Sequence, residues 1–269
     1  MEKGNKKSII FGIIIAILAI AAVIFVALFN SRNKEVPEEQ LNSVTDIFEY
    51  YIFSMTKGYP TQYMGIDTLY EKDETKYEDL HYNAILNTAA IYASEQLDNS
   101  ISDDIKAIVT NTYGYKDEST YTLFKGESVK EAVKILFGKE DFEHGTGIND
   151  GTFGYDFTYL YEIDLYVREE NNSLYVNNEE HFLDYKILNS KSLKDDKVEV
   201  TVAIAYVHKF DQKVIYTSDS KGNEVVFETT PTKYGIPDDK EDKFQKYNVT
   251  FKTDKNNKTY SFESIKKVK

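Results

Sequence analysis

The chain has 269 residues, 41% of them hydrophobic, which allows a sizeable core in one large domain or two small ones. It contains no cysteine, so disulfides, thiol catalysis, cysteine-ligated metals and a lipidated N-terminal cysteine are excluded. The formal net charge of −13 repels phosphate backbones, which argues against nucleic acid as a partner.

The N-terminal part of the sequence predicts one transmembrane helix. Residues 9–29 carry no charged or hydrogen-bonding side chain, and a helix of that length reaches about 30 Å, the thickness of the hydrocarbon layer. A cleaved signal peptide is the alternative, because Ala19-Ile20-Ala21 resembles a cleavage site. The apolar region of a signal peptide, however, usually has only about 7–15 residues. We therefore expect an uncleaved anchor at 8–29.

The charges beside this helix predict its orientation. The tail at 1–7 carries three basic residues, Lys3, Lys6 and Lys7, which favour a cytoplasmic N-terminus. A polar linker at 30–36 then leads into an extracytoplasmic domain at 37–269. We expect a single-pass protein of the cell membrane whose main domain lies close to the outer surface of the bilayer.

Four helices are predicted in the first half of this domain. The first begins at Pro37, and its apolar residues recur at spacings of three and four, at Leu41, Val44, Phe48, Tyr51 and Met55. The second covers about 78–97 and the third follows Ser102. The fourth covers 129–137, with a capping box formed by Ser128 and Glu131 before it and Gly138 after it.

From about residue 151 the apolar period changes from 3.6 to 2, which predicts strands. One strand is expected at 153–165, one at 183–187 and one at 198–210, with a turn at 194–197 between the last two. Two hairpins follow. Their strands and turns are 213–217 with 224–228 around Gly222-Asn223, and 247–251 with 260–262 around Asn256-Asn257.

Helices to about residue 138 and a mostly antiparallel sheet from about 151 predict an α+β fold in two layers. A helical first half packed on a long sheet is also the element order of cystatin-like and NTF2-like folds. The sequence shows no internal repeat and no low-complexity segment.

The segment from Lys139 to Asp156 is the candidate metal site. Four of its residues could supply ligands, Asp141, Glu143, His144 and Asp150. Calcium takes six to eight oxygen ligands from loops of this kind. EF-hand spacing is absent, because Thr146 and Ile148 stand where acidic residues or asparagines are needed. The alternative interpretation is a turn-rich connection between a helix and a strand.

The remaining residues predict neither a catalytic site nor a cofactor. No G-x-S-x-G elbow marks a serine hydrolase, and Gly145-Thr146-Gly147 lacks the P-loop lysine. His208 continues an apolar strand face, and His81 and His181 lie in polar surroundings. The chain has 22 tyrosines and no tryptophan. Tyrosine rings on a sheet face could stack on sugars, so wall glycan is one candidate partner; the alternative is that they fill the core and rim of the sheet.

Three segments of the sequence carry a resemblance to other proteins: IDTLYEKDETKYEDLHYNAIL at 66–86, VKEAVKILFGKEDF at 129–142 and FQKYNVTFKTDKNNKTYSFESIKKV at 244–268. With the lysine-flanked anchor, they resemble uncharacterised single-pass membrane-anchored proteins of low-GC Gram-positive bacteria. That resemblance implies a location in the cell envelope and no assigned activity.

These observations predict a non-enzymatic binding or accessory domain of the bacterial cell envelope, with an envelope protein or wall glycan as its partner. Two alternatives stay open. One is a glycan-active or wall-modifying enzyme, which needs two carboxylates in a tyrosine-lined cleft. The other is a sensor of divalent cations built on residues 139–156.

Overall fold

The computed structural model describes residues 41, 44, 73–80, 82–147, 155–170, 180–210, 212–219, 222–254 and 259–269. The predicted membrane segment at 8–29 and the linker at 30–36 lie outside these residues, as does most of the first predicted helix. None of the described helices is long and apolar enough to cross a membrane. Leu41 and Val44 are helical, Val44 is buried in the main core and Leu41 packs against it, as the apolar stripe predicts.

The described part of the chain is α+β, as predicted. Its helices are α4 (Tyr82–Gln96), α5 (Asp103–Tyr113) and α6 (Gly126–Phe137), with short 3₁₀ helices η1 (Tyr77–Asp79), η2 (Tyr161–Ile163) and η4 (Glu241–Lys243). Its strands are β1 (Glu74–Lys76), β2 (Tyr121–Lys125), β3 (Tyr155–Leu160), β4 (Leu165–Glu170), β5 (Glu180–Ser192), β6 (Lys197–Lys209), β7 (Val214–Thr217), β8 (Val225–Thr229), β9 (Gln245–Asp254) and β10 (Thr259–Lys267).

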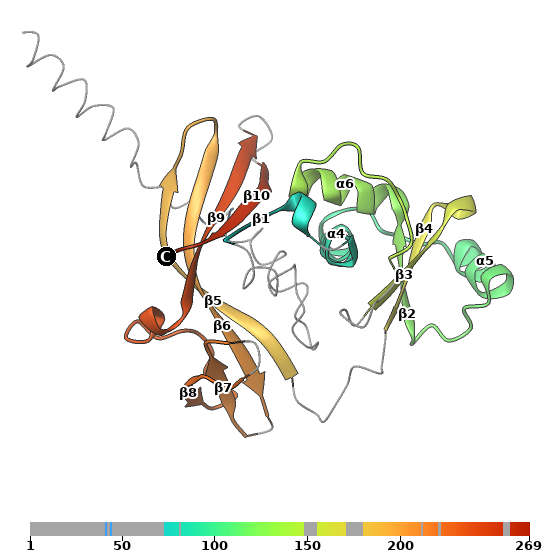
Figure 1. Cartoon of the computed structure of the whole chain (residues 1–269). Coiled ribbons are helices and arrows are strands. Elements are labelled where there is room, and N and C mark those ends of the chain that lie inside the picture. The colour runs from blue at the N-terminus through green and yellow to red at the C-terminus, as the bar shows by residue number, and fades with distance from the viewer. Residues whose placement is uncertain are drawn as a thin grey trace, which may run out of the picture.

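The strands form two antiparallel sheets. The large sheet has the order β1-β10-β9-β6-β7-β8, and β5 also pairs with β6. The small sheet has the order β2-β4-β3. Figure 1 shows α4 and α6 between the two sheets, with α5 beyond the small sheet. The main core joins residues of both helices and of both sheets.

Helix α4 is buried nearly all round because it lies between the two sheets. Every residue from Asn83 to Ala90 is buried, whereas the sequence pattern predicts a single apolar side. A helix that is surrounded by packed layers has no solvent face to keep polar. Its small residues, Ala84, Ala89, Ala90 and Ala93, are all at 1% exposure or less, which lets the neighbouring elements approach closely.

Strand β6 is the central strand of the large sheet and has two buried faces. Val198, Val200 and Val202 point into the main core. Ala203, Ala205 and Val207 face the other way, into a second core with Val214, Tyr216, Ile236 and Phe244. The period-2 pattern at 198–210 therefore predicts the strand correctly, but two cores rather than one account for its apolar residues.

Several predicted boundaries are confirmed. Ser102 caps α5, where its Oγ accepts a hydrogen bond from the Ile105 amide at 3.4 Å. Gly138 ends α6 in the left-handed region at φ 65°. The hairpin of β7 and β8 turns at Gly222. Strands β9 and β10 pair with Phe251 opposite Phe262.

The predicted capping box at Ser128 and Glu131 is wrong. Helix α6 begins at Gly126, with Lys125 as its N-cap. Ser128 instead donates a hydrogen bond from Oγ to the carbonyl of Asp98 at 2.7 Å. A Cβ atom at position 126 would lie 1.9 Å from Asp164 Oδ1, so the close approach of that carboxylate explains why a glycine opens the helix.

The predicted strand at 153–165 is a hairpin. Strand β3 ends at Leu160, η2 and Asp164 make the turn, and β4 returns antiparallel to it. Asp164 has φ 48°, and its carboxylate accepts a hydrogen bond from the Tyr159 hydroxyl at 2.5 Å. Strands β1 and β2 are not predicted by the sequence pattern, and they precede the region where strands are expected.

Candidate functional site

The predicted metal candidates do not gather in the described structure. Asp141 and Glu143 are exposed, His144 is half-buried, and Asp150 lies outside the described residues. In the part of the chain that the structure describes, no three His, Cys, Asp or Glu side chains come together as a metal site.

His144 belongs to an aromatic cluster between α4 and the small sheet. Its ring stacks on Tyr159 with centroids 4.6 Å apart, and its Nδ1 lies 3.1 Å from the Tyr166 hydroxyl. Phe142 meets the imidazole edge-on at 5.7 Å. Burial lowers the pKa of His144 below its usual value, which favours the neutral imidazole. Through these contacts His144 contributes to the packing between α4 and the small sheet.

The backbones of two other histidines lie opposite each other in the large sheet. The register of β5 and β6 places the backbone of His181 opposite His208, a proximity that sequence spacing does not reveal. His208 is buried, as its apolar strand face predicts. Gly222 closes over its ring, because a Cβ atom at position 222 would lie 2.9 Å from His208 Cε1. The side chain of His181 and the whole of His81 lie outside the described residues.

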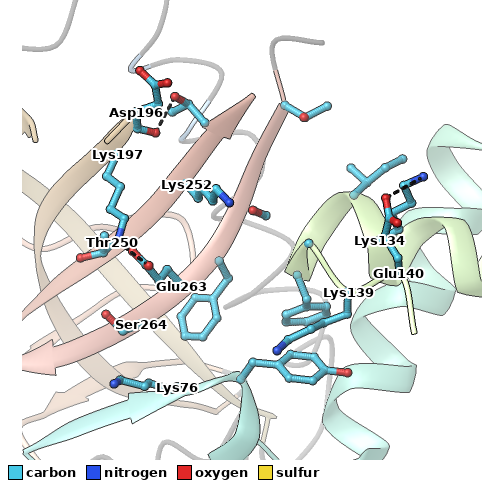
Figure 2. Close-up of a pocket in the computed structure, with 18 of the residues that line it drawn as sticks. Lys76, Lys134, Lys139, Glu140, Asp196, Lys197, Thr250, Lys252, Glu263 and Ser264 are labelled. Atoms are coloured by element: carbon cyan, nitrogen blue, oxygen red, sulfur yellow. Dashed lines mark hydrogen bonds and ion pairs between the residues drawn. The ribbon is translucent and has the colours of Figure 1, made fainter. Parts of the chain in front are cut away.

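A large cleft of about 1390 Å³ lies between the C-terminal end of α6 and the strands β9 and β10. Figure 2 shows lysines on both of its walls. The lysines that line it are Lys76, Lys134, Lys139, Lys197 and Lys252, and the acidic residues are Glu74, Glu78, Glu131, Glu140, Asp196 and Glu263. The lining also includes several Thr and Ser side chains of β9 and β10. The cleft is therefore a polar surface with charges of both signs.

Three ion pairs hold part of this charge in place. Lys197 binds Glu263 at 2.6 Å, Lys139 binds Glu78 at 2.8 Å, and Lys134 binds Glu140 at 3.4 Å. The Lys139 ammonium also lies 4.6 Å from the centre of the Tyr77 ring, a cation–π contact. The hydrogen bond from Lys139 lowers the pKa of Glu78. The carboxylates of Glu78, Glu140 and Glu263 therefore already have lysine partners.

The cleft could not be read from the sequence. Its wall residues come from β1, α6, β6, β9 and β10, which only strand pairing brings together. Of the described acidic and histidine side chains in the segment 139–156, only Glu140 lines it. Tyr77 is the one tyrosine among the described lining residues of the cleft, whereas Tyr166, Tyr206, Tyr216 and Tyr247 are fully buried, which agrees with the core-filling alternative.

Comparison with protein-family models, with curated proteins and with solved structures finds no match to this chain.

Proposed function

We propose that the protein is a non-enzymatic binding or accessory protein of the bacterial cell envelope, anchored by residues 8–29 and binding its partner in the α6–β10 cleft. The cleft carries this proposal. It is a wide polar hollow whose lining combines fixed ion pairs, lysines and hydroxyl groups. Such a surface suits recognition of a polar ligand by hydrogen bonds and charge.

The anchor is supported by the sequence. Residues 9–29 form an uncharged run long enough to cross a bilayer as a helix, and the strings at 66–86, 129–142 and 244–268 resemble membrane-anchored envelope proteins. The wall-modifying enzyme receives less support, because three carboxylates of the cleft pair with lysines. The divalent-cation sensor receives none from the described part of segment 139–156.

The finer fold relation is also a proposal. Helices α4 and α6, which share one core with the long, bulged strands of the large sheet, support a relation to cystatin-like or NTF2-like folds. The small sheet on the opposite side of the same helices is an addition to such a plan.

Two experiments test the proposed function. The first adds protease to intact bacteria that carry the full chain with a C-terminal tag. We expect the tag to be cleaved while the anchor stays in carbonate-washed membranes. A protected tag, or a protein released by carbonate, overturns the placement.

The second experiment sediments purified cell walls with the full chain in detergent. We expect the chain to pellet with the walls and to leave the wall polymers intact. Turnover of wall glycan or peptide by the pure protein, abolished by a point substitution, replaces the binding role with an enzymatic one.

A further inference from the structure

Strand register places three lysines of the cleft on one face of the large sheet. Lys197 of β6 lies opposite Lys252 of β9, which lies opposite Ser261 of β10. In the next row, Thr250 lies opposite Ser264, which lies opposite Lys76 of β1. Side chains of directly opposed residues share a face of a sheet. All six of these residues line the cleft, so three ammonium groups and three hydroxyls belong to one wall, on the sheet face opposite to Val198, Phe251 and Phe262 of the main core.

Lys197 and Lys252 place two positive charges opposite each other, and only one of them has a carboxylate partner in the described part of the chain. Like charges directly opposite each other on a sheet are destabilising. Glu263 binds Lys197 at 2.6 Å. It is the extra residue of a bulge, since Phe262 pairs with Phe251 and Ser264 with Thr250, and bulges re-aim side chains. Within the described residues no carboxylate pairs with Lys252. One ammonium group is therefore left for a ligand.

Lys76 adds a second available cation on the same wall. Its side chain is exposed, and among the described residues it makes no ion pair. Ammonium groups and hydroxyls together are the donors that proteins use for phosphate oxygens. A carboxylate has fewer acceptor oxygens to satisfy them.

We propose that the sheet wall of this cleft, around Lys252, Lys197, Lys76, Thr250, Ser261 and Ser264, binds a single phosphate group of an otherwise neutral or zwitterionic ligand. This proposal rests on the proposed binding function and names the ligand chemistry of that site. A polyanion does not fit, because Glu131 and Glu74 also line the cleft. The net charge of −13 permits one phosphate, since at physiological salt exposed charges beyond about 8 Å are largely screened.

The test is calorimetric titration of the full chain in maltoside micelles, which contain no phosphate, with glycerol 3-phosphate and with inorganic phosphate. We expect saturable binding of glycerol 3-phosphate. Lys252→Gln should weaken it about threefold to tenfold, and Lys252→Glu should remove it. Glu263→Gln should tighten it, because Lys197 then loses its competing carboxylate. Lys106→Gln, which removes a half-buried lysine of α5 paired with Asp103, is the matched control and should change nothing.

A second arm identifies the source of the phosphate. The full chain is moved from micelles into phospholipid nanodiscs and titrated again. Weaker binding of glycerol 3-phosphate in nanodiscs assigns the site to a lipid headgroup, and equal binding assigns it to a soluble or wall-borne phosphate.

The proposal is overturned if micelle-bound protein shows no saturable binding at millimolar phosphate probes, or if the Lys252→Glu protein binds them like the unchanged protein. Its failure is distinct from failure of the proposed function. Wall sedimentation that persists in Lys252→Glu without any phosphate binding keeps the binding role and removes the phosphate. Phosphate binding without wall sedimentation keeps the phosphate site and removes the proposed binding to the cell wall.

Discussion

The large and the small sheet share one main core with helices α4 and α6, but they bring different chemistry to it. The large sheet presents mainly aliphatic and phenyl groups, such as Val200, Val249 and Phe251. The small sheet presents aromatic rings that carry polar atoms, with Tyr159 and Tyr166 beside His144, and it adds Arg168, which donates to Asn87 of α4 at 3.0 Å. Apolar contact supplies most of the stability, whereas hydrogen-bonded contact makes the fit specific and is costly when one partner is lost.

The first way to test this difference is to open a cavity on the large-sheet side. Phe251 is fully buried in the main core, so Phe251→Ala should lower the free energy of unfolding by about 3–5 kcal/mol. Urea denaturation of the full chain in detergent, followed by circular dichroism, measures this loss. Val225→Ala, at a side chain that is 52% exposed, is the control and should stay within about 0.5 kcal/mol. A loss below about 1 kcal/mol for Phe251→Ala would contradict the packing of this face.

The second test removes a polar contact from the small-sheet side. Asn87→Ala deletes one acceptor of the Arg168 guanidinium and should cost about 1–3 kcal/mol. The double variant Asn87→Ala/Arg168→Met should recover part of that loss, because no donor is then left without its acceptor. If the single and double variants lose the same amount, the hydrogen bond does not distinguish the two sides of the helical layer.

The third test concerns the helix beyond the small sheet. Ser102→Ala removes the N-cap of α5 and should cost about 1 kcal/mol, measured by the same urea titration. Ser102→Asp keeps an acceptor at the cap and should retain most of the stability. An equal loss in both variants would show that the hydroxyl acts through some contact other than the cap.

The smallest expected effect is a dependence on pH. Burial lowers the pKa of His144 below its usual value of 6.5, so between the folded and unfolded pKa values the unfolded chain binds more protons. Stability should therefore fall as the pH is lowered from 7 through 6.5 toward the folded pKa. His144→Phe should remove this part of the pH dependence. Unchanged curves in the two proteins would show that the imidazole is not desolvated.

Where a region has a regular apolar period, the sequence predicts the fold well. Strand β6 alternates polar and apolar residues from Lys197 to Val202. Ser102 marks a helix start by its hydroxyl group and Gly138 marks a helix end by its left-handed backbone. Strand β1 has no such signal, because Glu74, Thr75 and Lys76 become a strand only through pairing with β10. The capping box at Ser128 fails for a related reason. A tertiary hydrogen bond to Asp98 takes the hydroxyl that the local pattern assigns to the helix.

The candidate site was less predictable than the fold. The sequence has many potential metal-ligating residues near His144, which suggests a metal site. In the structure the imidazole instead packs against the aromatic rings of Phe142 and Tyr159. The cleft depends on residues as far apart as Lys76 and Lys252, and each is an unremarkable surface lysine in its own segment. Only the register of β1, β10 and β9 places them on the same face of the sheet, and register is a property of the assembled sheet.

The pairing of β1 with β10 also has a consequence during protein synthesis. Residues 74–76 leave the ribosome long before residues 264–266, their partners in the sheet. The small sheet, whose strands all lie between 121 and 170, can close while translation continues. In the large sheet, β9 and β1 cannot find their shared partner until β10, the last described strand, has been synthesised. A nascent chain stalled before β10 would therefore expose the edge of β9, and an unpaired strand edge can pair with other chains and aggregate.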